Sequence, residues 1–191
     1  MKKYIQLAVV LLVISGLSGL VLSLTYQFAK PAIDQVALNK INDSMHEWFP
    51  VVPLDNKKEN ATPDYTITDP NINNVYDAKD ANGNIVGYVI EAKAPESYGG
   101  GMVLLVGIDN NGKVVGYTYL TFNESGPGAN VRNNTTFHDS LIGQTQVEDQ
   151  NGNFTVAWVT GASFTSKATL RGIHNALTWY HDNVTEVTSN D

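Results

Sequence analysis

Residues 5–28 form an uninterrupted apolar segment that contains no charged side chain. At about 1.5 Å per residue, a helix of this length extends roughly 36 Å, enough to cross a hydrocarbon core of about 30 Å. A cleaved signal peptide is the alternative, but its apolar region usually has about 7–15 residues and ends at small side chains. This segment is longer and is followed by Lys30 and Pro31. The sequence therefore predicts a retained transmembrane anchor over residues 1–30.

The charges around this segment indicate its orientation. Lys2 and Lys3 precede it and only Lys30 follows closely, so the positive-inside rule favours a cytoplasmic N-terminus. We therefore expect a single-pass protein of the cell membrane whose main domain lies outside the cytoplasm. The chain contains no cysteine, which excludes disulfides and Cys-ligated iron–sulfur clusters. Its net charge of −7, without a basic stripe, argues against nucleic-acid binding.

The chain after the anchor has the pattern of an α+β domain. Residues 31–52 place apolar side chains at helical spacing and predict a membrane-proximal helix. Residues 53–74 lack periodicity, which predicts a loop or irregular linker with a short strand near residues 65–68. We expect the main domain to occupy residues 53–191.

Two similar segments predict β-hairpins in this domain. The pattern of residues 80–88 returns in residues 109–117, and in both an Asn-Gly pair precedes β-branched and aromatic residues. Such a pair supplies the positive φ angles of a tight turn. A third pair, Asn151-Gly152, predicts a further strand over residues 154–159. The fold class is therefore predicted to be α+β, with an antiparallel sheet built from hairpins and helices packed against it.

A cluster of hydroxyl side chains precedes the last predicted helix, which we place from about Thr165 to His181 with Thr165 or Ser166 as its N-cap. Residues 160–166 read Thr-Gly-Ala-Ser-Phe-Thr-Ser. The first N–H groups of a helix lack intrahelical partners and the helix dipole adds partial positive charge, so this position favours an anion such as phosphate. Plain capping of the helix is the alternative.

The segment Thr160-Gly161-Ala162-Ser163 resembles the (Ser/Thr)-Gly-Ala-Thr attachment motif of the covalent FMN-binding proteins. These include the G subunit of Rnf complexes and the C subunit of sodium-translocating NADH:quinone reductase. The resemblance implies FMN whose phosphate is esterified to Ser163. Two residues depart from the family pattern: Ser163 replaces the usual Thr, and Ala157 stands where the flavin transferase usually recognises Asp. Thr165 is the alternative acceptor.

The resemblance extends beyond the attachment motif. A Tyr98-Gly99-Gly100 turn precedes a predicted strand, and the loop Glu124-Ser125-Gly126-Pro127-Gly128-Ala129 resembles the family's Glu-Thr-Pro-Gly-Leu-Gly loop beside the flavin ring, with Gly and Pro in a different order. Glycines let backbone approach a planar ring. The predicted cofactor-binding residues are Tyr98, Glu124, Ser125, Gly126, Gly128, Thr160, Gly161, Ala162, Ser163, Phe164, Thr165, Ser166 and Arg171.

The roles of several neighbouring side chains stay open at this stage. Lys167 and Arg171 are candidates for neutralising the phosphate, or are solvated helix charges. Tyr98, Trp158 and Phe164 are candidates for packing on the flavin ring, or belong to the core.

The resemblance implies an electron-transfer subunit of a membrane-bound, Rnf-like, ion-translocating oxidoreductase, with other membrane subunits as partners and a flavin transferase for maturation. The alternatives are non-covalent FMN binding by the same fold, and a membrane-anchored, non-redox module that recognises a peptide or wall component. We predict no metal site and no catalytic residue, since the histidines are scattered.

Overall fold

The computed structural model describes residues 2–53 and 65–185. The predicted linker over residues 53–74 therefore lies partly outside the described residues. The chain has two compact units, Met1–Leu38 and Asn39–Asp191. We describe each by itself.

The N-terminal unit belongs to helix α1 (Lys2–Trp48), which runs without a break across the predicted boundary between residues 30 and 31. Among the described residues, α1 is the one helix long and apolar enough to cross a membrane; the mean hydropathy of its best 18-residue window is 2.6. Its large apolar side chains are exposed, such as Leu12 and Leu22 at 73% and 72%. A helix satisfies its own backbone groups, as a membrane span requires, and such side chains suit a lipid environment.

A four-stranded antiparallel sheet forms the centre of the second unit, as predicted. Its strands are β1 (Ile72–Lys79), β2 (Ile85–Ala94), β3 (Met102–Asp109) and β4 (Val114–Thr121). Their spatial order equals their sequence order, so the sheet is a meander of consecutive hairpins. Residues 65–69 form no strand, which corrects the short strand predicted near residues 65–68.

An aspartate closes each of the two predicted hairpin turns. The Asp80 carboxylate accepts hydrogen bonds from the N–H groups of Asn82 and Asn84 at 2.8 and 2.9 Å, while Gly83 adopts a φ of +83°. Asp109 and Asp149 make the equivalent bonds in the turns at Gly112 and Gly152. The sequence Asp-x-Asn-Gly therefore forms the same turn three times.

The strand predicted over residues 154–159 is wrong. After the third turn the chain makes a single bridge between Glu148 and Phe154 and then has no regular strand. Side chains of the following helix hold this segment instead: Arg171 lies over the Phe154 ring, and the Ser166 hydroxyl accepts from the Val159 N–H at 3.1 Å. The Asn151-Gly152 pair thus predicted the turn correctly, but a turn alone does not make the following residues a strand.

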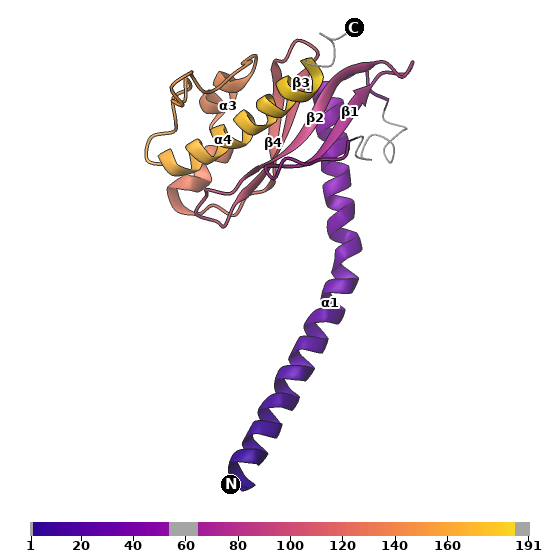
Figure 1. Ribbon diagram of the computed structural model, residues 1–191, viewed down its shortest axis with the longest axis vertical. Helices are drawn as coiled ribbons and strands as arrows, with labels where there is room; N and C mark the ends of the chain where they lie inside the picture. Colours follow the sequence, from indigo (N-terminus) through magenta and orange to yellow (C-terminus); the bar gives the residue numbers. More distant parts are fainter. Residues whose placement is uncertain (1, 54–64, 186–191) are drawn as a thin grey trace. The chain divides into compact units, whose positions relative to one another are not determined.

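Helix α4 (Ser163–Tyr180) packs across one face of the sheet (Figure 1). Its side chains Leu170 and Ile173 are fully buried, and Gly172 allows close approach to Leu104 of β3. The 3₁₀ helix η2 (Gly126–Asn133) and helix α3 (Thr135–Leu141) connect β4 to this region, and a π-helical turn, η3 (His181–Thr185), follows α4. The fold therefore brings the start of α4 near the segment that follows β4.

The last turns of α1 pack on the opposite face of the sheet. Ile41, Met45 and Phe49 are buried there. The Trp48 indole occupies the space that a Cβ atom would fill at Gly107 and Gly116, which are paired residues of β3 and β4. The sheet is therefore covered on both faces, which accounts for the nearly continuous burial of its strands.

Candidate functional site

The turn before α4 leaves the first backbone N–H groups of the helix open to a ligand. Gly161 takes a positive φ of +78°, and Ala162 is the N-cap, which has no side-chain oxygen to accept from the helix. Ser163 is the first helical residue and is exposed. The prediction of Thr165 or Ser166 as the N-cap is therefore wrong, because the helix begins before both. This position has the unsatisfied donors and the dipole that favour an anion.

The hydroxyls of Thr165 and Ser166 turn away from solvent. The Ser166 hydroxyl donates to the Ala162 carbonyl at 2.9 Å, and the Thr165 hydroxyl donates to the Glu124 carboxylate at 2.6 Å. Thr165 is 1% exposed and Ser166 is 0% exposed, so both are buried. Within the part of the chain that the structure describes, no hydrogen bond engages the Ser163 hydroxyl. Of the two predicted acceptors, Ser163 is thus the accessible one.

Glu124 joins three segments of the site. Besides the Thr165 hydroxyl, its carboxylate accepts from the Gly99 N–H at 2.8 Å. Burial of Glu124 raises its pKa, but the hydrogen bonds from Thr165, Gly99 and Ser97 together outweigh burial and hold the pKa below its ordinary value. The carboxylate is therefore ionised at neutral pH and links the turn after β2, the loop after β4 and the first turn of α4.

Gly128 fits closely against this link. A Cβ atom at Gly128 would lie 2.6 Å from the Thr165 hydroxyl oxygen and 3.1 Å from a Glu124 carboxylate oxygen. The glycine is therefore required for the approach of η2 to α4. Gly128 thus has a packing role in addition to the role predicted for it beside the flavin ring.

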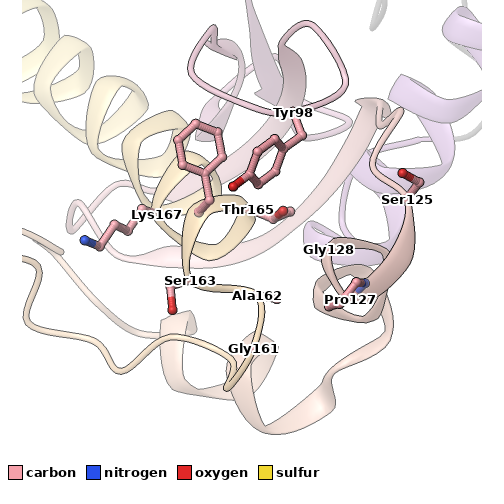
Figure 2. A pocket seen from close by; sticks show the side chains of 10 residues that line it. Tyr98, Ser125, Pro127, Gly128, Gly161, Ala162, Ser163, Thr165 and Lys167 are labelled. Carbon is pink, nitrogen blue, oxygen red and sulfur yellow. The ribbon is translucent and has the colours of Figure 1, made fainter.

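A pocket of about 560 Å³ opens at the start of α4 (Figure 2). This volume falls in the range of about 300–1,000 Å³ that is usual for cofactor sites. The pocket is lined by Tyr98, Ser125, Pro127, Gly128, Gly161, Ala162, Ser163, Phe164, Thr165 and Lys167. Pro127 was not singled out in the sequence, although its place in the Glu124 loop was available as a signal.

Two exposed aromatic side chains meet at this pocket. The rings of Tyr98 and Phe164 have centroids 4.4 Å apart at an interplanar angle of 43°, although they come from distant parts of the sequence. They are 79% and 44% exposed, so the expectation of a core role does not apply to them. Trp158, the third aromatic candidate, is not among the pocket-lining residues.

The two candidate cations occupy different places. Lys167 lines the pocket, and its ammonium lies 4.8 Å from the centroid of the Trp158 ring. Arg171 donates to the Glu148 carboxylate at 2.9 Å and is absent from the pocket lining. The pocket lining also leaves out Gly126, Thr160 and Ser166. Glu124 is not in the lining either, but it accepts from Thr165, which is. The remaining predicted residues all line the pocket.

A match to a known family covers the whole of this pocket. Residues 97–178 match the sequence profile described as the FMN-binding domain, and this stretch includes every residue of the pocket. This segment is therefore similar to FMN-binding domains. The resemblance seen in the sequence is therefore confirmed.

Curated relatives of this chain are G subunits of oxidoreductase complexes. The G subunit of the Na⁺-translocating ferredoxin:NAD⁺ oxidoreductase complex of Acetobacterium woodii is 24% identical over 95% of this chain and 93% of its own length. The proton-translocating counterpart of Clostridium ljungdahlii is 29% identical over 84% and 83%. The G subunit of the ion-translocating oxidoreductase complex of Shewanella amazonensis is 32% identical over 59% and 56%. The likeness to the first of these covers 95% of this chain, and therefore most of the N-terminal helix as well as the domain.

The residues of the FMN-binding domain fit the cofactor. An open helix N-terminus with an exposed Ser163 hydroxyl suits a phosphate, and Lys167 adds a positive charge on the same pocket. Gly128 and Gly161 keep bulky side chains out of the walls, and the aromatic pair of Tyr98 and Phe164 offers apolar surface to a planar ring.

Proposed function

We propose that this chain is an electron-carrying subunit of a membrane-bound, Rnf-like oxidoreductase complex and that FMN is held by a phosphoester to Ser163. The observation that carries the proposal is the exposed Ser163 hydroxyl at an uncapped helix N-terminus, inside the pocket of an FMN-binding domain. A helix N-terminus attracts and orients phosphate through its free N–H groups.

The contacts around the two hydroxyls support Ser163 over Thr165 as the acceptor. Ester formation replaces the hydroxyl proton, and Thr165 uses that proton in a 2.6 Å bond to Glu124 at a buried position. Modification of Thr165 would leave Glu124 ionised next to a phosphate, with one donor fewer. Ser163 loses no such bond, and its oxygen is accessible to a modifying enzyme.

When bound, FMN supplies one- and two-electron redox chemistry. The chain's own residues position it: Ser163 holds the phosphate end, and the helix N-terminus together with Lys167 compensates its charge. Tyr98 and Phe164 offer an apolar surface for the ring. The tether prevents loss of the cofactor by dilution.

The membrane context completes the proposal. The apolar part of α1 anchors the chain in the cell membrane, with the N-terminus in the cytoplasm and the FMN-binding domain outside it, as the flanking lysines favour. The partners are the other membrane subunits of a redox complex that couples electron transfer to ion translocation, and a flavin transferase that attaches FMN. The names of the curated relatives support this assignment.

Denaturing electrophoresis tests the attachment. The full-length chain is produced with and without a flavin transferase, and flavin fluorescence is recorded in the gel. We expect a fluorescent band only with the transferase, its loss in Ser163→Ala and its retention in Thr160→Ala, which removes an exposed hydroxyl outside the pocket lining.

Other outcomes of this experiment identify the alternatives. Flavin that is bound before denaturation but stripped by it indicates non-covalent binding and contradicts the ester. A colourless protein from the host with the transferase contradicts the redox role and favours a membrane-anchored module that binds a peptide or wall component.

A further inference from the structure

We propose that Lys167 is the residue that pairs with the flavin phosphate, and that Trp158 positions its ammonium group. This inference rests on the proposed attachment at Ser163. Ser163 and Lys167 are four residues apart on α4 and therefore neighbours on one helix face, with Cβ atoms about 5–6 Å apart. Both line the same pocket and lie on the same side of the helix start in Figure 2.

The surroundings of the pocket make a nearby cation necessary. Among the described residues that line it, Lys167 is the one that carries a positive charge. The ionised Glu124 lies behind the first turn of α4, and the whole chain has a net charge of −7. A phosphate at Ser163 therefore enters a negative environment, in which the helix dipole supplies only about half an elementary charge.

Arg171 does not fill this role, although its guanidinium is better suited to bidentate phosphate binding. Its Nη1 donates to Glu148 at 2.9 Å, and its guanidinium also lies over the Phe154 ring, 5.1 Å from the centroid. These contacts hold it on the loop that precedes α4. The guanidinium thus has its charge compensated away from the pocket.

Trp158 supports Lys167 from the segment before the helix. A free lysine side chain populates many rotamers and loses conformational entropy when it is fixed. The Trp158 ring, 4.8 Å from the ammonium, attracts the cation and limits these rotamers before a ligand arrives. Trp158 is still 46% exposed, so its ring face serves the lysine without belonging to the core.

Comparison of FMN with riboflavin tests this inference, because the two differ only in the phosphate. The full-length chain is purified in detergent from a host without flavin transferase, and the Kd of each flavin is measured by fluorescence titration. We expect Lys167→Met to weaken FMN binding about fivefold and to leave riboflavin binding unchanged. Lys167→Arg is expected to keep most of the affinity for FMN, and Trp158→Leu to lose about twofold for FMN alone.

Arg171→Met is the matched control, since it removes a cation from the same helix outside the pocket; the ratio of the two Kd values is expected to stay as in the wild type. Equal weakening of FMN and riboflavin in Lys167→Met, or no weakening of either, overturns the phosphate role of Lys167. Binding of neither flavin to the wild-type chain also overturns the role of Lys167, and the proposed function is refuted only if the chain also stays colourless in the host with the transferase.

Discussion

The hydrogen bond between Thr165 and Glu124 is expected to stabilise the domain by an amount that a double-mutant cycle can measure. The variants are Glu124→Gln, Thr165→Val and the double variant. The bond is 2.6 Å long, it involves an ionised carboxylate, and its partners are 9% and 1% exposed. Hydrogen bonds to charged groups contribute about 1.5–3 kcal/mol. Valine has the shape of threonine, so the cavity is unchanged.

The assay is urea unfolding of the full-length chain in detergent, followed by tryptophan fluorescence. We expect each single variant to lower the free energy of unfolding by about 1–3 kcal/mol, and the double variant to lose less than the sum, with a coupling energy of at least about 1 kcal/mol. A coupling energy near zero refutes the assigned bond. Because Thr165 is not the proposed acceptor, Thr165→Val is expected to retain covalent flavin.

Two further predictions concern the same contacts, and a third concerns the opposite face of the sheet. The folded-state pKa of Glu124 is lowered from 4.5, so the contribution of its carboxylate to the free energy of unfolding is fully present above pH 4.5. This contribution is lost as the pH falls through the folded-state pKa. In urea titrations, the difference in stability between wild type and Glu124→Gln is therefore expected to shrink on acidification. Gly128→Ala puts a Cβ atom 2.6 Å from the Thr165 hydroxyl and should cost about 1–3 kcal/mol in the same assay and reduce flavin incorporation; unchanged stability contradicts the close fit. Gly116→Ala overlaps the Trp48 indole and should lower the thermal midpoint by several degrees without changing the flavin Kd.

Local sequence signals were sufficient for the anchor helix and the paired hairpins. The apolar segment of residues 5–28 lies within one helix, and both Asp-x-Asn-Gly turns join neighbouring strands, because turn chemistry and β-branched runs act over a few residues. The strand predicted after Asn151-Gly152 failed for a long-range reason. Contacts with Arg171 and Ser166 of α4 satisfy that segment instead of a sheet partner.

The candidate site shows the same division. The hydroxyl cluster at residues 160–166 indicated a helix start, but α4 begins at Ser163, two residues before the predicted start. Which hydroxyl is buried depends on Glu124, which accepts from Thr165 and lies 41 positions earlier in the chain. Likewise, Tyr98 and Phe164 were separate candidates that the fold brings together. Arg171, and not Lys167, was among the predicted cofactor-binding residues, whereas in the structure Arg171 contacts Glu148 and Lys167 lines the pocket. Partners that are distant in sequence leave no local signal.

The most direct test of the central claim is a peptide mass spectrum of the full-length chain matured with a flavin transferase. The ester at Ser163 predicts that the peptide containing residues 160–166 gains the mass of FMN less one water, and that fragmentation assigns this mass to Ser163. An unmodified peptide from a matured chain, or fragmentation that assigns the flavin phosphate to Thr165, contradicts the account.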